Sequence, residues 1–406
     1  MLGCGAPPES ADLVVTNARV IDGRGVVHDS AVIAITGKRI QSITSGQKQF
    51  NARETIDAQG KTVLPGLINT HVHLRPAGLV DEETLTEYLR NDFLVDLQDY
   101  LEHGITTLKS AGDPAEIFIQ VRERLARGEI RGPRLFLAGP PLTAVGGHPA
   151  ATLFADNSWL RTRHVQELSS EAEARAAVRQ LAEAGVDAIK FVYQGSTDES
   201  KPYLFRPGLP LRKMTPQMME AIIDEAHQHQ LPVTAHTNDL EDALAVLEAG
   251  CDGLEHGVTR MRLEDEKLGT LLRERQASYV PTLRLPDRRR PEDLETAMAN
   301  LKQVAQAGGR VVLGTDGIPS AGGSGLDTLK ELELMVQAGM SPQQVIQAAT
   351  RNAAEHLGKL GELGTLEPGA WADLILVEGD PLTDITALHN IEVVILGGEI
   401  VVDNRN

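Results

Sequence analysis

Six potential metal ligands follow short apolar segments of this 406-residue chain. They are His71 and His73 in NTHVHL, Lys190 in AIKFVY, His236 in VTAHT, His256 in GLEHG and Asp316 in LGTDG. Each closes a segment that is typical of a buried β-strand, and side chains at the carboxyl ends of barrel strands meet on one face. Imidazole and carboxylate groups bind zinc and related divalent ions. The order of these residues predicts a single site for two metal ions.

His71 and His73 are two residues apart, so in a strand both imidazoles point to the same side and can reach one cation. A His-x-His pair alone is often a surface or core accident, but here it follows the apolar segment LPGLINT. His236 and His256 end two later strands. Each of them alone would often be a hydrogen-bonded core histidine, but in this order we interpret them as ligands of a second metal.

Lys190 lies in an apolar strand, where an ammonium group is costly. It could extend along the barrel rim to a carboxylate. Alternatively, burial lowers the pKa of the amine, and a neutral amine can take up carbon dioxide to form a carbamate that bridges two metals. Asp316 could cap the next helix, or touch one metal and act as general base and then general acid. We expect the second role for both residues.

Other histidines and arginines have weaker signals. His227 and His229 lie near the end of a helix and are predicted to be solvated. An arginine run follows the seventh predicted strand and could meet an anionic substrate, although a solvated face is the expected reading; it comprises Arg284, Arg288, Arg289 and Arg290. No supporting context exists for His28, His103, His164, His356 and His389.

The middle of the chain alternates apolar strands with helical segments, which indicates parallel strands with helical crossovers. Eight strands are predicted at 63–73, 104–112, 134–140, 188–193, 232–237, 253–257, 278–283 and 311–316. Helices are predicted at 169–185, 215–230, 239–250 and 341–358, the last with the capping box of Ser341 and Gln344. We therefore expect an α/β fold, a (β/α)8 TIM barrel over residues 63–360.

Both ends of the chain read as short β-strands with turns. Residues 12–60 contain such strands, and similar segments return at 364–378 and 391–403. Since the termini of a domain often lie close together, we expect residues 1–62 and 361–406 to form one composite β-sandwich domain, with residues 1–11 as a flexible tail.

Composition excludes some function classes. The 39 Lys and Arg against 57 Asp and Glu give a net charge of −18, the wrong sign for binding nucleic acid or anionic lipid. No segment has the roughly 20 apolar residues that span a bilayer. A cytoplasmic protein is therefore expected. Leu2, Gly3 and Cys4 resemble the end of a bacterial lipoprotein signal, so a lipid-anchored or periplasmic protein is the alternative.

Taken together, the motif LPGLINTHVHL and the four later strand-end residues resemble the amidohydrolase superfamily, specifically its binuclear branch with a carboxylated lysine. The segment TAVGGHP is similar to the Gly-Gly-His loop of the imidazolonepropionase-like and Xaa-Pro dipeptidase-like members. The resemblance implies that His148 lies over the substrate carbonyl and stabilises the oxyanion. It implies that one metal is held by His71, His73 and Asp316, the other by His236 and His256, with carboxylated Lys190 as the bridge.

One departure concerns the fifth strand, where dipeptidase-like members carry a Tyr two residues after the histidine and this chain has Asn238. Cleavage next to proline is therefore in doubt, and Tyr193 is a candidate to polarise the carbonyl instead. Arg75 completes a His-x-His-x-Arg spacing that dihydroorotase-like members use to hold a substrate carboxylate.

The resemblance implies hydrolysis of an amide C–N bond in an N-acyl amino acid, a dipeptide or a cyclic amide by a metal-bridging hydroxide. Zinc suits the imidazole-rich ligand set. The alternatives are an esterase, lactonase or organophosphate hydrolase at the same site, a single-metal deaminase, which Lys190 disfavours, and a non-catalytic scaffold, which the complete ligand set disfavours. A homo-oligomer is an expectation from the family.

Overall fold

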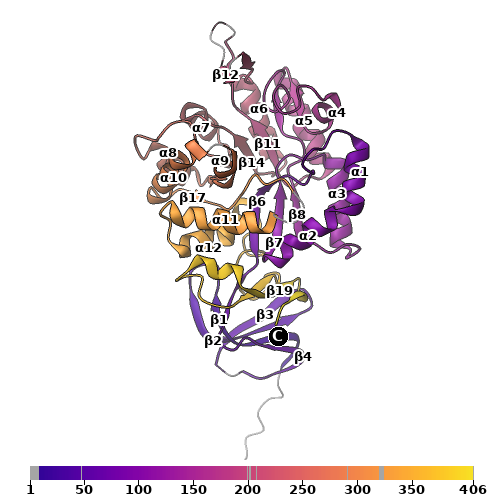
Figure 1. Cartoon of the computed structure of the whole chain (residues 1–406), viewed down its shortest axis with the longest axis vertical. Helices are drawn as coiled ribbons and strands as arrows, with labels where there is room; N and C mark the ends of the chain where they lie inside the picture. The colour runs from indigo at the N-terminus through magenta and orange to yellow at the C-terminus, as the bar shows by residue number, and fades with distance from the viewer. Residues whose placement is uncertain are drawn as a thin grey trace, which may run out of the picture.

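The computed structural model describes residues 9–46, 48–198, 200, 203–206, 208–289, 291–319 and 324–405, which leaves Cys4 and Arg290 outside the described residues. Figure 1 shows a helix-rich part above a smaller all-β part, which contains the C-terminus. Within these described ranges, no helix combines the length and apolar character needed to cross a membrane.

The all-β part is one eight-stranded sheet built from both ends of the chain. Strands β19, β18, β5, β1 and β2 are neighbours in that order, and β4 also pairs with β1. Apolar side chains on one face form a separate core cluster that includes Ile33, Val63 and Leu376. The strands are β1 Glu9–Ile21, β2 Val27–Thr36, β3 Arg39–Ser45, β4 Phe50–Asp57, β5 Thr62–Pro65, β18 Leu374–Val377, β19 Ile391–Leu396 and β20 Glu399–Asp403.

The helix-rich part contains two parallel sheets that position the site. One has the order β6-β7-β8 and the other β10-β9-β11-β14-β15-β16-β17. The strands are β6 Leu67–Val72, β7 Ile105–Ser110, β8 Arg134–Leu137, β9 Leu142–Ala144, β10 Gln166–Leu168, β11 Ile189–Val192, β14 Val233–His236, β15 Gly253–Glu255, β16 Ser278–Val280 and β17 Arg310–Val311. A hairpin of β12 Tyr203–Arg206 and β13 Leu209–Leu211 projects at the end far from the all-β part (Figure 1).

Backbone hydrogen bonds join the two parallel sheets at both edges. The N–H groups of Asp187 and Ala188, just before β11, donate to the carbonyl of Leu137 at the end of β8. At the other edge the N–H of Thr70 in β6 donates to Leu313, and the N–H of Asp316 donates to the carbonyl of His71. The chain after β17 therefore runs beside β6 and delivers Asp316 to the same edge as His71.

Helices surround these strands (Figure 1). They are α1 Glu82–Asn91, α2 Phe93–Glu102, α3 Ala115–Ala126, α4 Ser158–Arg163, α5 Glu171–Ala184, α6 Pro216–Gln228, α7 Leu240–Glu248, α8 Lys267–Arg275, α9 Arg284–Arg289, α10 Pro291–Gln306, α11 Ser324–Gln337, α12 Pro342–Ala349 and α13 Arg351–His356, with a 3₁₀ helix at Ile385–His389. Their apolar faces pack with the strands into the largest core cluster.

The predicted helix starts are confirmed. The segment 341–358, however, was predicted as one helix and forms two. The hydroxyl of Ser341 and the side chain of Gln344 form the capping box, as predicted. The chain then breaks at Thr350, whose φ of −130° and ψ of −96° are not helical, and a second helix begins at Arg351. The Thr350 hydroxyl donates to the carbonyl of Ile346 at 2.6 Å, and such side-chain bonds compete with the helical ladder.

The prediction of a flexible tail over residues 1–11 is wrong for residues 9–11. Residues 9–11 already belong to β1, where Glu9, Ser10 and Ala11 pair with Phe50, Asn51 and Ala52 of β4 in parallel. This pairing satisfies their backbone groups, which a solvated tail would leave to water.

Candidate active site

Strand β6 and the segment after β17 bring His71, His73 and Asp316 together. The N–H of His73 donates to the carbonyl of Gly317 at 2.8 Å, which keeps the two segments side by side. Asp316 has a positive φ of 51°. Gly314 permits the close approach, because a Cβ there would lie 2.8 Å from the Cβ of His71. The local backbone is therefore shaped to aim the Asp316 carboxylate at the two histidines.

The Asp316 carboxylate faces three imidazoles. Its Oδ1 lies 3.0 Å from Nε2 of His73 and 3.3 Å from Nε2 of His71, and its Oδ2 lies 4.0 Å from Nδ1 of His256. Burial raises the pKa of Asp316, but the neighbouring imidazoles outweigh burial and hold the pKa well below its usual range. One candidate ligand atom from each of His71, His256 and Asp316 lies within 4.8 Å of the others. The group has the composition and spacing of a metal-binding cluster.

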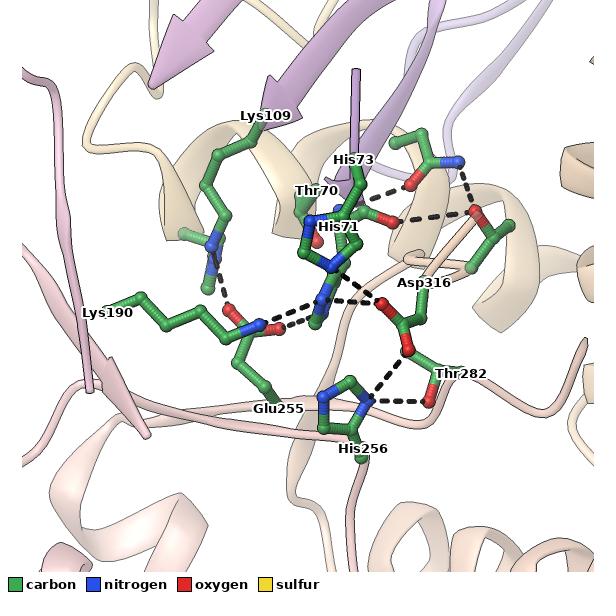
Figure 2. Close-up of polar contacts among 12 residues, drawn as sticks. Thr70, His71, His73, Lys109, Lys190, Glu255, His256, Thr282 and Asp316 are labelled. Carbon is green, nitrogen blue, oxygen red and sulfur yellow. Dashed lines mark hydrogen bonds and ion pairs between the residues drawn. The ribbon is translucent and has the colours of Figure 1, made fainter. Parts of the chain in front are cut away.

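Lys190, in the middle of β11, reaches the same cluster (Figure 2). Its Nζ lies 3.0 Å from Nε2 of His71, and the side chain is buried. Burial lowers the pKa of Lys190. A buried amine with a lowered pKa spends more time neutral, which is the state that reacts with carbon dioxide.

His236 at the end of β14 and His256 just after β15 complete the cluster. Their ring centroids are 4.6 Å apart, and the His256 ring lies 4.7 Å from that of His71. Burial lowers the pKa of both His236 and His256 well below the ordinary value. Their imidazoles are therefore neutral at pH 7 and keep a lone pair for a cation. The amide of Asn238 lies 3.2 Å from Nε2 of His236, where it takes the place that the resemblance assigns to Tyr.

A pocket of about 630 Å³ opens over this cluster. His148 lies at its wall, with its ring stacked 4.9 Å from that of His236. Burial lowers the pKa of His148 to about 4. The lining includes His73, Arg75, His148, Phe154, His164, Lys190, His236, Asn238, His256, Arg260, Leu285 and Asp316.

Of two residues predicted to contact the substrate, Arg75 and Tyr193, only the first lines the pocket. Arg75 lines the pocket, with its guanidinium 5.5 Å from the centroid of the Phe154 ring. Tyr193 is buried, has the Lys213 ammonium 4.9 Å from its ring, and is not among the described residues that line the pocket.

Two members of the predicted arginine run, Arg284 and Arg288, pair with carboxylates of the protein itself. Nε of Arg284 donates to Asp327 at 3.0 Å, and the same guanidinium also bonds to Asp287, while Arg288 pairs with Asp327. His227, predicted to be solvated, is 44% exposed and pairs with Asp252.

Four residues in or beside the site were not predicted from the sequence. Glu255 and Lys109 are buried and paired next to His71, and Lys109 also contacts His356. His164 is fully buried and lines the pocket. Signals existed for two of them: Glu255 directly precedes His256 in GLEHG, and Lys109 lies in an apolar strand just as Lys190 does.

Residues 62–401 match the sequence model of the amidohydrolase family. The chain belongs to the amidohydrolase family. Among its relatives, the ochratoxinase of Aspergillus niger is 28% identical over 318 residues, which cover 70% of this chain and 62% of the length of that enzyme. The imidazolonepropionase of Thermoanaerobacter pseudethanolicus is 23% identical over 385 residues, covering 86% of this chain and 84% of that enzyme.

This chain is also similar to solved structures. A crystal structure of a Xaa-Pro dipeptidase with bound methionine matches 96% of this chain and 99% of its own, with a TM-score of 0.79 and 27% identity. The resemblance to imidazolonepropionase-like and dipeptidase-like amidohydrolases is therefore confirmed.

Proposed function

We propose that this protein is a metal-dependent amidohydrolase that cleaves a C–N amide bond of a small molecule, such as an N-acyl amino acid, a dipeptide or a cyclic amide. The observation that supports this best is the Asp316 carboxylate, which faces His71, His73 and His256 at the floor of a pocket. The ochratoxinase, imidazolonepropionase and dipeptidase relatives support hydrolysis at carbon–nitrogen bonds.

The chemistry of these side chains fits a pair of divalent cations. Asp316 contributes a negative charge, because its pKa is held low. The imidazoles of the cluster contribute lone pairs, because burial lowers their pKa values and keeps them neutral. A cation would balance the carboxylate and accept the lone pairs of the imidazoles, and zinc suits this nitrogen-rich group of ligands. We assign one cation to His71, His73 and Asp316 and the other to His236 and His256.

Lys190 would join the two cations as a carbamate. The lowered pKa of its buried amine favours reaction with carbon dioxide, and the carbamate would replace a costly buried cation by an anion with two oxygens. The position of its Nζ, 3.0 Å from Nε2 of His71, is compatible with this role.

Two divalent cations, when bound, supply a hydroxide from water at neutral pH and polarise a carbonyl. Asp316 accepts the proton that the attacking water loses and delivers it to the departing nitrogen. Arg75, which lines the pocket, is the candidate to bind a carboxylate of the substrate. We assign no substrate contact to Tyr193, because it is not among the described residues that line the pocket.

His148 would donate an N–H to the substrate oxygen as negative charge develops there. Its lowered pKa makes the ring neutral at pH 7, so only one nitrogen carries hydrogen. Nδ1 lies 2.7 Å from Oγ1 of Thr152, which lies 3.3 Å from the carbonyl of Pro149. The contact with Thr152, whose hydroxyl donates to the carbonyl of Pro149, holds the His148 ring at the wall of the pocket.

For the fold, we propose that β6, β7, the β8–β9 segment, β11, β14, β15, β16 and the β17 segment form a closed (β/α)8 barrel. The hydrogen bonds at both sheet edges support closure. The sequence predicts a barrel at 63–360 and a composite β-sandwich domain formed by 1–62 with 361–406, and we propose this division with one change. The boundary moves from residue 62 to residue 65, because β5 pairs with β1 and β18 of the all-β sheet and only β6 belongs to the barrel.

Metal content together with turnover tests the proposed function. Elemental analysis of chelator-free protein should find about two divalent ions per chain, and Lys190→Ala should reduce this to one or none. The wild type should hydrolyse members of an N-acyl amino acid, dipeptide and cyclic amide panel. No metal in the wild type would support the scaffold alternative, whereas metal with turnover of esters or lactones only would support the esterase alternative.

A further inference from the structure

A buried chain of polar side chains lies behind His71, on the side away from Asp316 (Figure 2). Oε2 of Glu255 lies 2.7 Å from Nδ1 of His71, and Oε1 of Glu255 accepts a hydrogen bond from Nζ of Lys109 at 2.9 Å. Nζ of Lys109 also lies 2.7 Å from Nε2 of His356. Glu255 and Lys109 are 0% and 1% exposed, so these contacts have no competition from solvent.

The charge of Glu255 dictates where His71 carries its hydrogen. Glu255 is buried with one oxygen on the Lys109 ammonium and the other on the His71 ring, so its carboxylate is paired with a cation on the side away from His71. An ionised carboxylate only accepts hydrogen bonds, so Nδ1 of His71 is the donor in this contact. In a neutral imidazole the lone pair is then on Nε2, the atom that faces Lys190 and Asp316.

Lys109 is needed because a lone carboxylate at this depth would be very costly. Its ammonium donates to Glu255 on one side and to His356 on the other. Burial lowers the pKa of His356 well below the ordinary value, so the ring is a neutral acceptor that adds no second positive charge. Strand β7 and helix α13 thereby hold the carboxylate of Glu255 in one position.

We propose that Glu255 and Lys109 are positioning residues that fix His71 in the Nδ1–H tautomer and direct its Nε2 to the metal site. This inference rests on the proposed function for the identity of the site. Without the carboxylate, His71 could place its hydrogen on Nε2 or rotate its ring. In either state Nε2 would not present a lone pair to the metal.

Glu255→Gln tests this role at nearly constant volume. An amide has only one oxygen for its two donor neighbours, so one of His71 and Lys109 would face an N–H group. Outer carboxylate partners of metal-binding histidines typically contribute about 10- to 100-fold to metal affinity, and we expect a loss of that size for zinc in competition with a chromogenic chelator. Glu331→Gln is the matched control, because Glu331 is equally buried but accepts from the N–H groups of Leu283 and Arg284.

Equal losses in the two variants would show a general structural effect and overturn the inference, and so would an unchanged affinity in Glu255→Gln. A wild type that binds no zinc would instead overturn the proposed function. The tautomer can be read separately in metal-free protein by nitrogen-15 NMR of labelled histidines, with the His71 signal assigned through His71→Asn. Hydrogen on Nδ1 in the wild type and on Nε2 in Glu255→Gln is expected; hydrogen on Nε2 in the wild type would refute the positioning role.

Discussion

Nζ of Lys190 lies 3.0 Å from Nε2 of His71, although the two residues are 119 positions apart in the sequence. Both side chains are buried, so neither contact atom is satisfied by bulk water. An ammonium group that remained charged here would repel the cations that we assign to this site. The proposed carbamate removes that conflict, and it makes the chemistry of Lys190 testable.

Metal loading should depend on carbon dioxide. Metal-free protein that is reloaded with zinc in buffer freed of carbon dioxide should recover less metal and less activity than protein reloaded with bicarbonate. The reason is that carbamate formation needs carbon dioxide and the neutral amine of Lys190. Elemental analysis and turnover measure the difference. Lys190→Arg should not respond to bicarbonate, and equal recovery of the wild type in both buffers would argue against the carbamate.

Asp316→Asn should lower kcat by about 10²- to 10⁴-fold, because an amide cannot accept and return the proton. Steady-state kinetics on whichever amide substrate the panel identifies would check this. Asp373→Asn is the comparison variant, since Asp373 pairs with Arg134 away from the pocket. It should reduce stability and leave kcat of the folded protein close to that of the wild type. A normal kcat in Asp316→Asn would remove Asp316 from the reaction.

Thr152→Val should lower kcat with little change in KM. The hydroxyl of Thr152 lies 2.7 Å from Nδ1 of His148 and holds the ring in position, and without it the ring can rotate away from the substrate oxygen. The loss should reach up to about 10²-fold, the lower range for removal of a transition-state donor. Thr152→Ser keeps the hydroxyl and should restore activity. If the serine variant were as slow as the valine variant, the methyl group rather than the hydroxyl would be responsible.

Arg75→Met should raise KM about 10- to 100-fold for substrates with a carboxylate, because it removes a charge-assisted hydrogen bond. The corresponding carboxamides should show a much smaller change, and the comparison of the two substrate series measures the effect of the charge alone. An equal rise for both series would mean that Arg75 shapes the pocket, in which its guanidinium lies over Phe154.

His164 should make the protein less stable in acid. Burial lowers its pKa from 6.5 to about 4, so between these values the unfolded chain binds a proton that the folded chain does not. Stability is therefore lost as the pH falls from about 6.5 to about 4, by at most about 1.4 kcal/mol per pH unit. Urea unfolding of metal-free protein at pH 7, 6 and 5 should show a shallower decline for His164→Phe. Parallel declines in the two proteins would contradict this assignment.

The sequence alone indicated which residues follow the buried apolar segments, although the strand predicted to end at Asp316 is shorter and ends at Val311. His71, His73, His236, His256 and Asp316 each follow an apolar segment, and a parallel arrangement sends the ends of such segments to one edge whatever the details of packing. The sequence also predicted that both ends of the chain contribute to one β-structure, because β-strand patterns occur at both ends. These features depend on local periodicity, which a sequence carries directly.

Tertiary structure decided the contacts that no local pattern encodes. The sequence shows Lys109 in an apolar strand and Glu255 next to His256, but only the packing of β7 against β15 places Nζ of Lys109 2.9 Å from Oε1 of Glu255 beside His71. His356 had no sequence context, and only the position of helix α13 places its Nε2 2.7 Å from Nζ of Lys109. The protonation and tautomer of a buried imidazole depend on the charges that surround it in space, so the chemical state of this site could be inferred only once the chain was folded.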